Sequence, residues 1–320
     1  MAGLIERARR LHKTIVFPEG SDPRVVEAAA RLARDGVVKP VLVGPQPQGA
    51  PAGVAFADPA RWPSAEKYAA LYYERRRAKG ITQVEAATMA RQPLYFAALM
   101  VAAGEADGTV GGAANTTADT VRAALQSIGP DPRVRLVSSI FLMALADRSQ
   151  GHNGLMAFAD CAVVVDPTPV ELAEIAIATA HSVRALLATE PVVALLSFST
   201  KGSARHPHAD AVIEALQIVR ARAPEIVIDG ELQADAAVNA LVGNSKAPGS
   251  RVAGRANTLV FPNLGSANIA YKLLERLGGA AAIGPFLQGL ARPANDLSRG
   301  CSVEDIYHVA VVTALQSEPG

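Results

Sequence analysis

The segment KTIVF (residues 13–17), followed by PEGSDP (residues 18–23), decides the fold. KTIVF is a short apolar run with β-branched and aromatic residues, which predicts a buried strand. PEGSDP is typical of a turn, and the apolar period that follows predicts a helix over residues 24–34. PVLVG at residues 40–44 predicts a second strand. The chain is therefore expected to begin with a strand–helix–strand unit.

The same alternation continues along the chain. Further strands are expected at residues 108–111, 135–139, 160–165, 191–198, 226–229 and 258–261, mostly separated by helices. Residues 46–63 are rich in Pro, Gly and Ala, which predicts a loop with little structure. Alternating strands and helices predict an α/β protein with parallel or mixed sheets covered by helices on both faces.

Ligands in such folds bind beyond the carboxyl ends of the strands. Four loops therefore become candidates for a binding site, at residues 18–23, 111–117, 199–206 and 229–235.

Length and composition exclude several classes of protein. The chain has 320 residues, which predicts two domains or one large α/β unit. Half of the residues are hydrophobic and the net charge is +1, whereas disordered chains are poor in apolar residues and highly charged. The 31 basic residues balance 30 acidic ones, so we expect no nucleic-acid partner, since such partners require net positive charge.

Cysteine usage and the N-terminus favour a cytoplasmic protein. Cys161 and Cys301 are far apart, and no CxxC motif or metal-ligand spacing occurs. The first 14 residues carry several charges and lack the apolar core of a secretion signal. No apolar run approaches the roughly 18 residues that a membrane-spanning helix needs. We therefore expect neither a metal site nor a membrane partner.

Common nucleotide, metal and hydrolase motifs are missing, but two polar clusters stand out. The chain has no GxxxxGK[ST], GxGxxG, HExxH or GxSxG sequence. The cluster at 197–203 could hold an anion through its hydroxyl and backbone N–H groups, or could simply form a turn and cap. In the cluster at 295–305, Ser302 and Asp305 have the spacing of a capping box, so Asp305 could serve only the helix that follows.

The arginines leave similar alternatives open. Arg75, Arg76 and Arg77 could bind an anion or could lie at a solvated helix end, where cations are favoured. Arg122 could bind an anion or could form a surface ion pair with Asp119, three residues earlier.

Several segments carry a further signal when they are taken together and in order. They are TIVFPEGSDPR (14–24), DGTVGGA (107–113), TADTVR (117–122), FADCAV (158–163), STKGSA (199–204), GRAN (254–257), IGPFLQG (283–289) and NDLSRGCS (295–302). With these segments the chain resembles the phosphate acetyltransferase (phosphotransacetylase) family over nearly its full length. The resemblance implies reversible transfer of an acetyl group between acetyl phosphate and coenzyme A.

The resemblance also implies an architecture and partners. It implies two three-layer α/β domains of the isocitrate/isopropylmalate-dehydrogenase kind, with the active site in a cleft between them. Domain I is expected over residues 1–139, completed by the C-terminal segment 295–320, and domain II over 140–294. Coenzyme A is implied as a substrate, with no tightly bound cofactor, and the protein is expected to be a homodimer that acts on small molecules.

The resemblance assigns roles to particular residues. Asp305 is implied to be the catalytic base, with Ser298 and Arg299 beside it. Phosphate or coenzyme A is implied to be bound by Arg76, Arg122 and Thr117. The implied mechanism is direct attack of the coenzyme A thiolate in a ternary complex, although Cys301 lies near enough in sequence that a covalent route needs testing.

Three alternatives stay open. A phosphate butyryltransferase, or another acyl-chain variant, would use the same residues with a different pocket volume. A non-catalytic module that senses acetyl-CoA would tend to lose the catalytic residues, which are all present here. A decarboxylating dehydrogenase of the same fold would need a cluster of metal-binding acids, which the sequence does not show.

Overall fold

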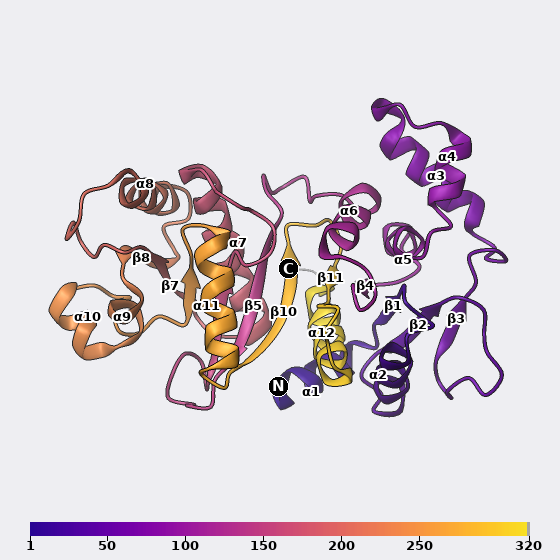
Figure 1. The fold of residues 1–320 in the computed structure, drawn as a ribbon, viewed down its shortest axis with the longest axis horizontal. Coiled ribbons are helices and arrows are strands. Elements are labelled where there is room, and N and C mark those ends of the chain that lie inside the picture. Colours follow the sequence, from indigo (N-terminus) through magenta and orange to yellow (C-terminus); the bar gives the residue numbers. More distant parts are fainter. Residues whose placement is uncertain (319–320) are drawn as a thin grey trace. The chain divides into compact units, whose positions relative to one another are not determined.

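The computed structural model describes residues 1–318, and the chain divides into two compact units (Figure 1). The first unit comprises residues 1–133 and is completed by the segment from Leu290 onward; the second comprises residues 134–289. These divisions lie a few residues before the expected ones at 139/140 and 294/295. Strand β5 (Ser138–Ala144) would be cut by a boundary at 139/140, whereas it lies wholly within the second unit.

The first unit is built on a five-stranded parallel sheet in the order β11-β4-β1-β2-β3. The strands are β1 (Thr14–Phe17), β2 (Lys39–Val43), β3 (Ala55–Ala57), β4 (Gly108–Gly111) and β11 (Ala294–Asp296). Ile15, Val16 and Phe17 are completely buried. Burial on both faces explains why the central strand is a continuous apolar run and does not alternate.

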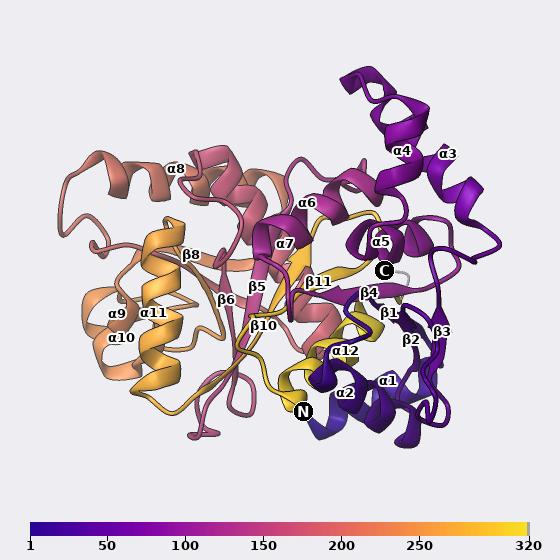
Figure 2. The ribbon, with the colours of Figure 1, turned by 45° about the vertical axis from the view of Figure 1, so that its right-hand side comes forward.

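Helices cover both faces of this sheet (Figure 2). One layer contains α1 (Ala2–Leu11), α2 (Pro23–Arg34) and α12 (Val303–Gln316). The other contains α3 (Ala65–Arg76), α5 (Pro93–Ala102) and α6 (Thr117–Ser127), with the short helices η1 (Arg77–Lys79) and α4 (Gln83–Met89) following α3. Helix α2 begins where the sequence predicts, because Asp22 caps it by accepting a hydrogen bond from the Arg24 N–H.

The second unit is also three-layered, around a six-stranded mixed sheet in the order β10-β5-β6-β9-β7-β8. Its other strands are β6 (Leu155–Ala159), β7 (Val192–Leu196), β8 (Val227–Leu232), β9 (Thr258–Val260) and β10 (Ala281–Gln288). Helices α7 (Pro169–Leu187) and α8 (Pro207–Arg222) pack in one core. Helices α9 (Ala234–Val238), α10 (Ala240–Lys246) and α11 (Leu264–Arg276) follow on the opposite side, where α9 and α11 contribute to a second core.

The structure corrects three of the expected elements. The segment 46–63 contains the edge strand β3. The strand expected at 135–139 begins at Ser138 and runs on to Ala144. Residues 160–165 are not a strand, because the Asp160 carboxylate accepts hydrogen bonds from the N–H groups of residues 162–164 and curls the chain around itself.

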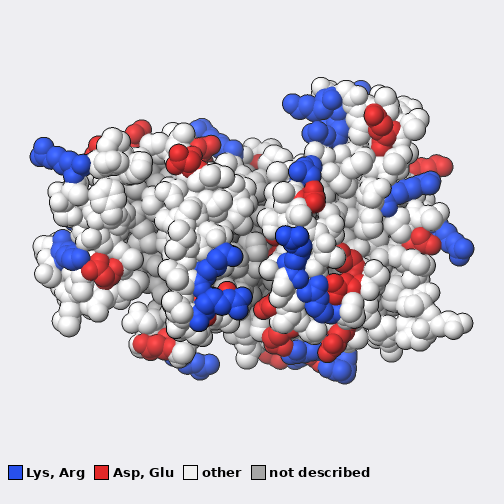
Figure 3. All heavy atoms as spheres, in the orientation of Figure 1, with Lys and Arg blue, Asp and Glu red and all other residues white. Residues whose placement is uncertain are grey.

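Acidic and basic side chains are interspersed on the face drawn in Figure 3. Basic side chains gather most clearly over the α3–α4 region. Among residues 1–318, no helix is both long enough and apolar enough to cross a membrane.

Candidate active site

The sheet of the first unit reverses its strand order between β1 and β4. From β1 the chain continues to β2 on one side, and it later returns to place β4 on the other side. The loops that leave β1 and β4 therefore diverge at their carboxyl ends, which is where ligands bind in open α/β sheets. Both loops, 18–22 and 112–116, are among those that the sequence singles out. A third loop, 297–302, follows the neighbouring strand β11.

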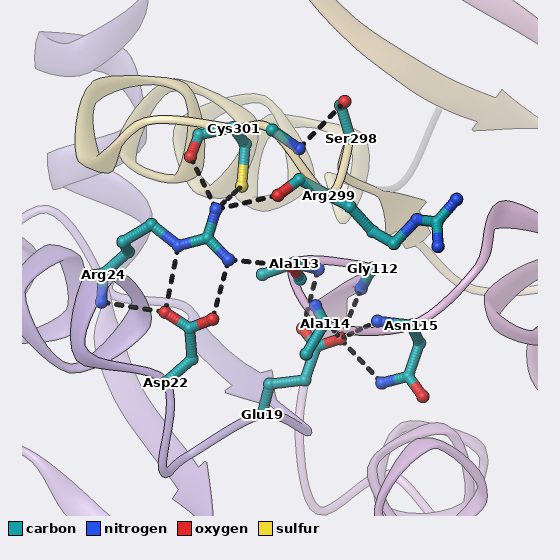
Figure 4. A network of polar contacts seen from close by, with 11 residues as sticks. Glu19, Asp22, Arg24, Gly112, Ala113, Ala114, Asn115, Ser298, Arg299 and Cys301 are labelled. Atoms are coloured by element: carbon teal, nitrogen blue, oxygen red, sulfur yellow. Dashed lines mark hydrogen bonds and ion pairs between the residues drawn. The ribbon is translucent and has the colours of Figure 1, made fainter.

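Glu19 joins the first two loops. Its carboxylate accepts hydrogen bonds from four successive backbone N–H groups, those of Gly112, Ala113, Ala114 and Asn115, at 2.9–3.1 Å. The Asn115 side-chain amide adds a fifth at 2.7 Å (Figure 4). Glu19 is only 8% exposed. Backbone N–H groups that converge in this way form a nest for an anion, and here the chain supplies the anion itself.

Arg24 joins all three loops. Its Nε and Nη2 donate to the Asp22 carboxylate at 3.1 and 2.7 Å, and Nη2 also donates to the Ala113 carbonyl at 2.8 Å. Its Nη1 donates to the carbonyls of Arg299 and Cys301, each at 2.9 Å (Figure 4). All five N–H donors of the guanidinium are thus used, and the close hydrogen bond to Arg24 lowers the pKa of Asp22.

The Ser298–Arg299 pair lies on the loop that Arg24 holds. The Cys301 N–H donates to the Ser298 carbonyl at 2.9 Å and closes a turn, and the Gly300 N–H donates to Ser298 Oγ at 3.3 Å. Both side chains are exposed. Among the described residues, the Arg299 guanidinium has no hydrogen-bond or ion-pair partner, and it points away from Arg24 (Figure 4). A hydroxyl and a free guanidinium are therefore presented side by side.

Asp305 lies in the first turn of α12 and forms the capping box that the spacing predicts. Its Oδ2 accepts hydrogen bonds from the N–H and hydroxyl of Ser302, both at 2.8 Å, and Ser302 Oγ accepts from the Asp305 N–H at 3.2 Å. Nothing in the part of the chain that the structure describes donates to Oδ1. The capping role therefore occupies one carboxylate oxygen and leaves the other without a donor among the described residues.

Cys301 is buried beneath this loop. Burial raises the pKa of its thiol to about 11, although the positive charge of Arg24 opposes the rise. A thiol with this pKa is protonated near neutral pH, and the thiolate is the nucleophilic form. The covalent route through Cys301 is therefore disfavoured. Cys161 is also buried, and it lies just after β6 and not within the strand expected at 160–165.

A pocket of about 740 Å³ lies beside the first two loops, and its lining includes Glu19, Tyr95, Asn115, Asp119 and Arg122. Arg122 forms the expected ion pair with Asp119, at 2.6 Å. Both partners are about half exposed, so the pair contributes little to stability.

Arg76 ends helix α3 near the same tyrosine. Burial raises the pKa of the Tyr95 hydroxyl, and the charges of Arg122 and Arg76 oppose that rise. Tyr72 and Tyr95 meet edge to face at 5.5 Å, and both hydroxyls donate to Gln126 Oε1. Arg76 and Arg122 are therefore both near enough to Tyr95 to influence the pKa of its hydroxyl.

Thr117 is committed to a buried acid. Its hydroxyl donates to Asp296 Oδ2 at 2.6 Å, which ties the start of α6 to the end of β11. Asp296 is 1% exposed, and its Oδ1 has no hydrogen-bond partner. Burial raises its pKa to about 6. Gly112 (φ +104°) lies directly against this oxygen, since a Cβ at residue 112 would meet Oδ1 at 2.3 Å.

The polar cluster at 197–203 belongs to the second unit, and its donors are used internally. The Glu231 carboxylate accepts from the Ser199 hydroxyl at 2.8 Å and from the Gly202 N–H at 2.7 Å. Lys201 donates to Asp229 at 2.6 Å. The prediction that this cluster forms a turn is thus confirmed. Within the described residues, no group of three or more His, Cys, Asp or Glu side chains is arranged to hold a metal ion.

Comparisons with known proteins identify the family. A sequence model described as phosphate acetyl/butaryl transferase matches residues 1–314. The chain is 50% identical to the phosphate acetyltransferase of Paracoccus denitrificans over 314 residues, covering 98% of each protein. It is 44% identical to a phosphotransacetylase from Streptococcus pyogenes, whose crystal structure matches with a TM-score of 0.92 over 99% of this chain and 97% of that one.

The chain belongs to the phosphate acetyl/butaryl transferase family. A putative 4-hydroxythreonine-4-phosphate dehydrogenase from Salmonella typhimurium shares the fold alone, at 12% identity, with a TM-score of 0.54 over 95% of this chain and 99% of that one. The dehydrogenase-like α/β fold is thereby confirmed. The expected position of the active site between the domains stays a prediction.

For this member of the family, the structure forms two groups from the residues named in the sequence. Ser298, Arg299 and Asp305 share one loop and the turn that follows it, whereas Arg76 and Arg122 are linked only through their charges, which both act on Tyr95. Sequence reasoning missed Glu19, Arg24 and Asp296, although all three lie in the quoted segments TIVFPEGSDPR and NDLSRGCS. Only Glu19 carried a signal, because it lies just beyond the end of a predicted buried strand, and that signal marked its loop and not its role.

We predict that Arg24→Lys lowers kcat for acyl transfer by about tenfold or more while far-ultraviolet circular dichroism is unchanged. Lysine keeps the charge but lacks the planar fork, so it cannot serve Asp22 and three carbonyls at once. Leaving one such carbonyl without a partner costs about 1–3 kcal/mol, which is enough to move the Ser298–Arg299 loop. Arg34→Lys, on the exposed end of the same helix, is the matched control. A wild-type kcat for Arg24→Lys would contradict the role assigned to the fork.

We predict that Asp296→Asn changes how stability depends on pH. The carboxyl binds its proton more tightly in the folded chain (pKa about 6) than in the unfolded one (about 3.9), so stability falls as pH rises from about 4 to 6. The free energy of unfolding of the wild type falls by roughly 3 kcal/mol across that pH range, and it is not regained at higher pH. Asparagine does not titrate, so the free energy of unfolding of the variant should rise relative to that of the wild type as pH increases.

Urea unfolding of both proteins between pH 4.5 and 7.5 measures this difference. Glu27→Gln, which removes an exposed acid on α2, should follow the wild type in parallel. A constant difference between Asp296→Asn and the wild type at all pH values would refute the assignment.

Proposed function

We propose that this protein is a phosphate acetyltransferase, which reversibly transfers an acetyl group between acetyl phosphate and coenzyme A. The observation that carries the proposal is 50% identity to a protein of that name across 98% of both chains. The presentation of Ser298, Arg299 and Asp305 on one loop and the following helix turn supports it, because those groups match the needs of the reaction.

The forward reaction needs a thiolate, a stabilised carbonyl oxygen and a leaving phosphate. In the proposed step the coenzyme A thiol gives its proton to Asp305 Oδ1, and the sulfur forms a bond to the acetyl carbon. The bond between that carbon and the phosphate oxygen breaks, and phosphate leaves with the electron pair. The Ser298 hydroxyl already accepts from Gly300, so its own proton is available for the developing oxyanion or the thiol.

Arg299 is the group best placed to hold the phosphate. Its guanidinium is exposed and has no partner among the described residues, and a planar fork binds phosphate oxygens in bidentate fashion. Arg76 and Arg122 are proposed to bind further phosphate groups of the substrates, with Thr117 placed at the start of the helix that carries Arg122.

Proton transfer to Asp305 is difficult without help. An ordinary thiol (pKa about 8.5) and an ordinary aspartate (about 3.9) differ by about 4.6 units, or roughly 6 kcal/mol. We propose that nearby arginine charge stabilises the thiolate, and that transfer is concerted with attack on the carbonyl.

We also propose a cytoplasmic protein that uses coenzyme A as a diffusible substrate and holds no tightly bound cofactor. Both cysteines are buried and free, which fits a reducing compartment. Cell fractionation and native mass spectrometry of the purified protein test these two statements.

The experiment that tests the activity follows thioester formation by ultraviolet absorbance, with coenzyme A and either acetyl, propionyl or butyryl phosphate. We expect the highest kcat/KM with acetyl phosphate. One methylene changes binding in a fitted pocket by about 1–3 kcal/mol, so the preference should be at least several-fold per carbon. Preference for butyryl phosphate would instead make the protein a phosphate butyryltransferase.

The same assay tests the proposed base. Asp305→Asn keeps an oxygen for the helix cap but cannot take up a proton, so kcat should fall by at least about 100-fold at pH 7. Near-normal turnover would refute the role of Asp305. No thioester with any of the three acyl phosphates would refute the enzyme and would favour a module that only binds acetyl-CoA.

A homodimer is proposed, and helix α11 offers a candidate contact surface. Ile269 and Leu273 on the helix, and Leu277 just after it, are 61%, 52% and 82% exposed. Their spacing of four residues places them along one side of the helix. An exposed apolar stripe of this kind is typical of a surface that another protein covers.

We predict that Leu273→Glu converts the dimer to monomers in sedimentation equilibrium, because a charge would be buried without a partner. The wild type should sediment at twice the mass of one chain, and the variant at 33.2 kDa. Val84→Glu replaces a valine that is 77% exposed on the first unit, and should leave the dimer intact. A monomeric wild type would contradict the homodimer, and a dimeric Leu273→Glu would exclude this surface.

A further inference from the structure

Glu19 is a buried carboxylate that is held by hydrogen bonds, and the positive charge of Arg24 interacts with it without forming an ion pair. Among the described residues, no Lys or Arg forms an ion pair with it, and its five hydrogen bonds come from backbone N–H groups and one side-chain amide. A charge taken out of water is costly unless it is paired or fully hydrogen-bonded. A buried carboxylate is therefore stable in the fold only where its hydrogen bonds offset the free energy of desolvation.

Those hydrogen bonds all fall on one loop, immediately before helix α6. The bonded residues run without a gap from Gly112 to Asn115, and Thr116 then caps the helix. Gly112 needs its positive φ of 104°, which bends the chain so that its N–H joins the others. Without an anion at the centre, four parallel N–H groups would repel one another and compete for water.

The same loop forms part of the pocket. Glu19 and Asn115 line it together with Asp119 and Arg122, from the first and second turns of α6. Asn115 is held twice by Glu19, through its backbone N–H at 3.1 Å and its side-chain amide at 2.7 Å. The position of the Glu19 carboxylate therefore sets the position of Asn115 and the starting point of the helix that carries Arg122.

We propose that Glu19 is a positioning residue, whose carboxylate is the internal anion that completes the loop between β4 and α6 and thereby places Asn115 and Arg122 in the binding pocket. This inference rests on the proposed function for its kinetic consequence only. Because Glu19 fills the nest, a substrate phosphate cannot occupy it and is directed to the arginine side chains instead.

The first test is independent of any substrate. Glu19 Oε1 accepts four of the five hydrogen bonds, and Oε2 accepts only from the Ala113 N–H. In Glu19→Gln the amide oxygen can replace Oε1, whereas the amide NH₂ cannot accept from Ala113. Hydrogen exchange of the Ala113 amide should be at least tenfold faster than in the wild type. The exposed matched variant Glu27→Gln should exchange like the wild type. Unchanged exchange in Glu19→Gln would overturn the proposal.

The second test is kinetic. Because Glu19 touches the pocket and not the Ser298–Arg299 loop, Glu19→Gln should raise KM for coenzyme A or for acetyl phosphate at least tenfold, with kcat within threefold of wild type. A kcat loss with both KM values unchanged would overturn the positioning role. If the wild type forms no thioester, the proposed function fails, and the exchange experiment still decides whether Glu19 orders the loop.

The third test restores the missing anion. Glu19→Ala empties the nest, and formate is a carboxylate small enough to enter it. Added formate should raise the kcat/KM of Glu19→Ala at least fivefold, whereas chloride at equal ionic strength should leave it unchanged. The kcat/KM of Glu27→Ala should change with neither anion. If Glu19→Ala does not fold, the Glu19→Gln measurements decide. Equal responses to formate and chloride would overturn the proposal.

Discussion

The first unit depends on a single guanidinium. Arg24 uses every one of its N–H donors, and the acceptors lie on loops that leave three different strands, β1, β4 and β11. Two of those acceptors, the carbonyls of Arg299 and Cys301, are about 275 residues away along the chain. A charge-assisted fork is directional as well as strong, so it fixes how the C-terminal segment lies against the start of the chain. The loop that carries Ser298 and Arg299 takes its backbone geometry from this contact.

Internal carboxylates perform a related task in both units. Glu19 accepts hydrogen bonds from backbone N–H groups after β4, and Asp160 accepts them from N–H groups after β6. Glu231 accepts one from the loop after β7. Each of these loops resembles an anion-binding site, and in each the chain provides the anion. An external phosphate must therefore be bound mainly by side chains. This explains why a chain with a net charge of only +1 can be suited to phosphate chemistry: it needs a few placed arginines and no basic surface.

The sequence predicted best what depends on neighbouring residues. The strand predicted at 13–17, the helix predicted at 24–34 and the capping box of Ser302 and Asp305 follow from short patterns, and all three are present within a residue of the predicted bounds. Strand β11 is only three residues long and includes two polar ones, so it carries no strand signal of its own and exists because it pairs with β4. The segment 160–165 failed for the opposite reason, since an apolar pattern was overridden by the hydrogen bonds of one buried acid.

The site followed the same division. The family resemblance named Ser298, Arg299 and Asp305, whose roles stay predictions, but Arg24 looked like an ordinary residue in the first turn of a helix. Its acceptors are mostly backbone carbonyls, which leave no trace in the side-chain sequence, and they come from distant loops. Glu19 was equally hidden, because a nest of N–H groups can be recognised only after the chain has folded.

The three arginines assigned to phosphate differ in what binding requires of them. Arg299 has no partner within the described residues, so a phosphate that reaches it breaks no existing bond. Arg122 is already paired with Asp119, and a phosphate must compete with that carboxylate. The competition is favourable, because an exposed ion pair is weak and Asp119 keeps its hydrogen bonds from Thr116 after release. The exposed pair with Asp119 thus leaves Arg122 able to exchange partners, whereas Arg24, with every donor used, can only position other residues.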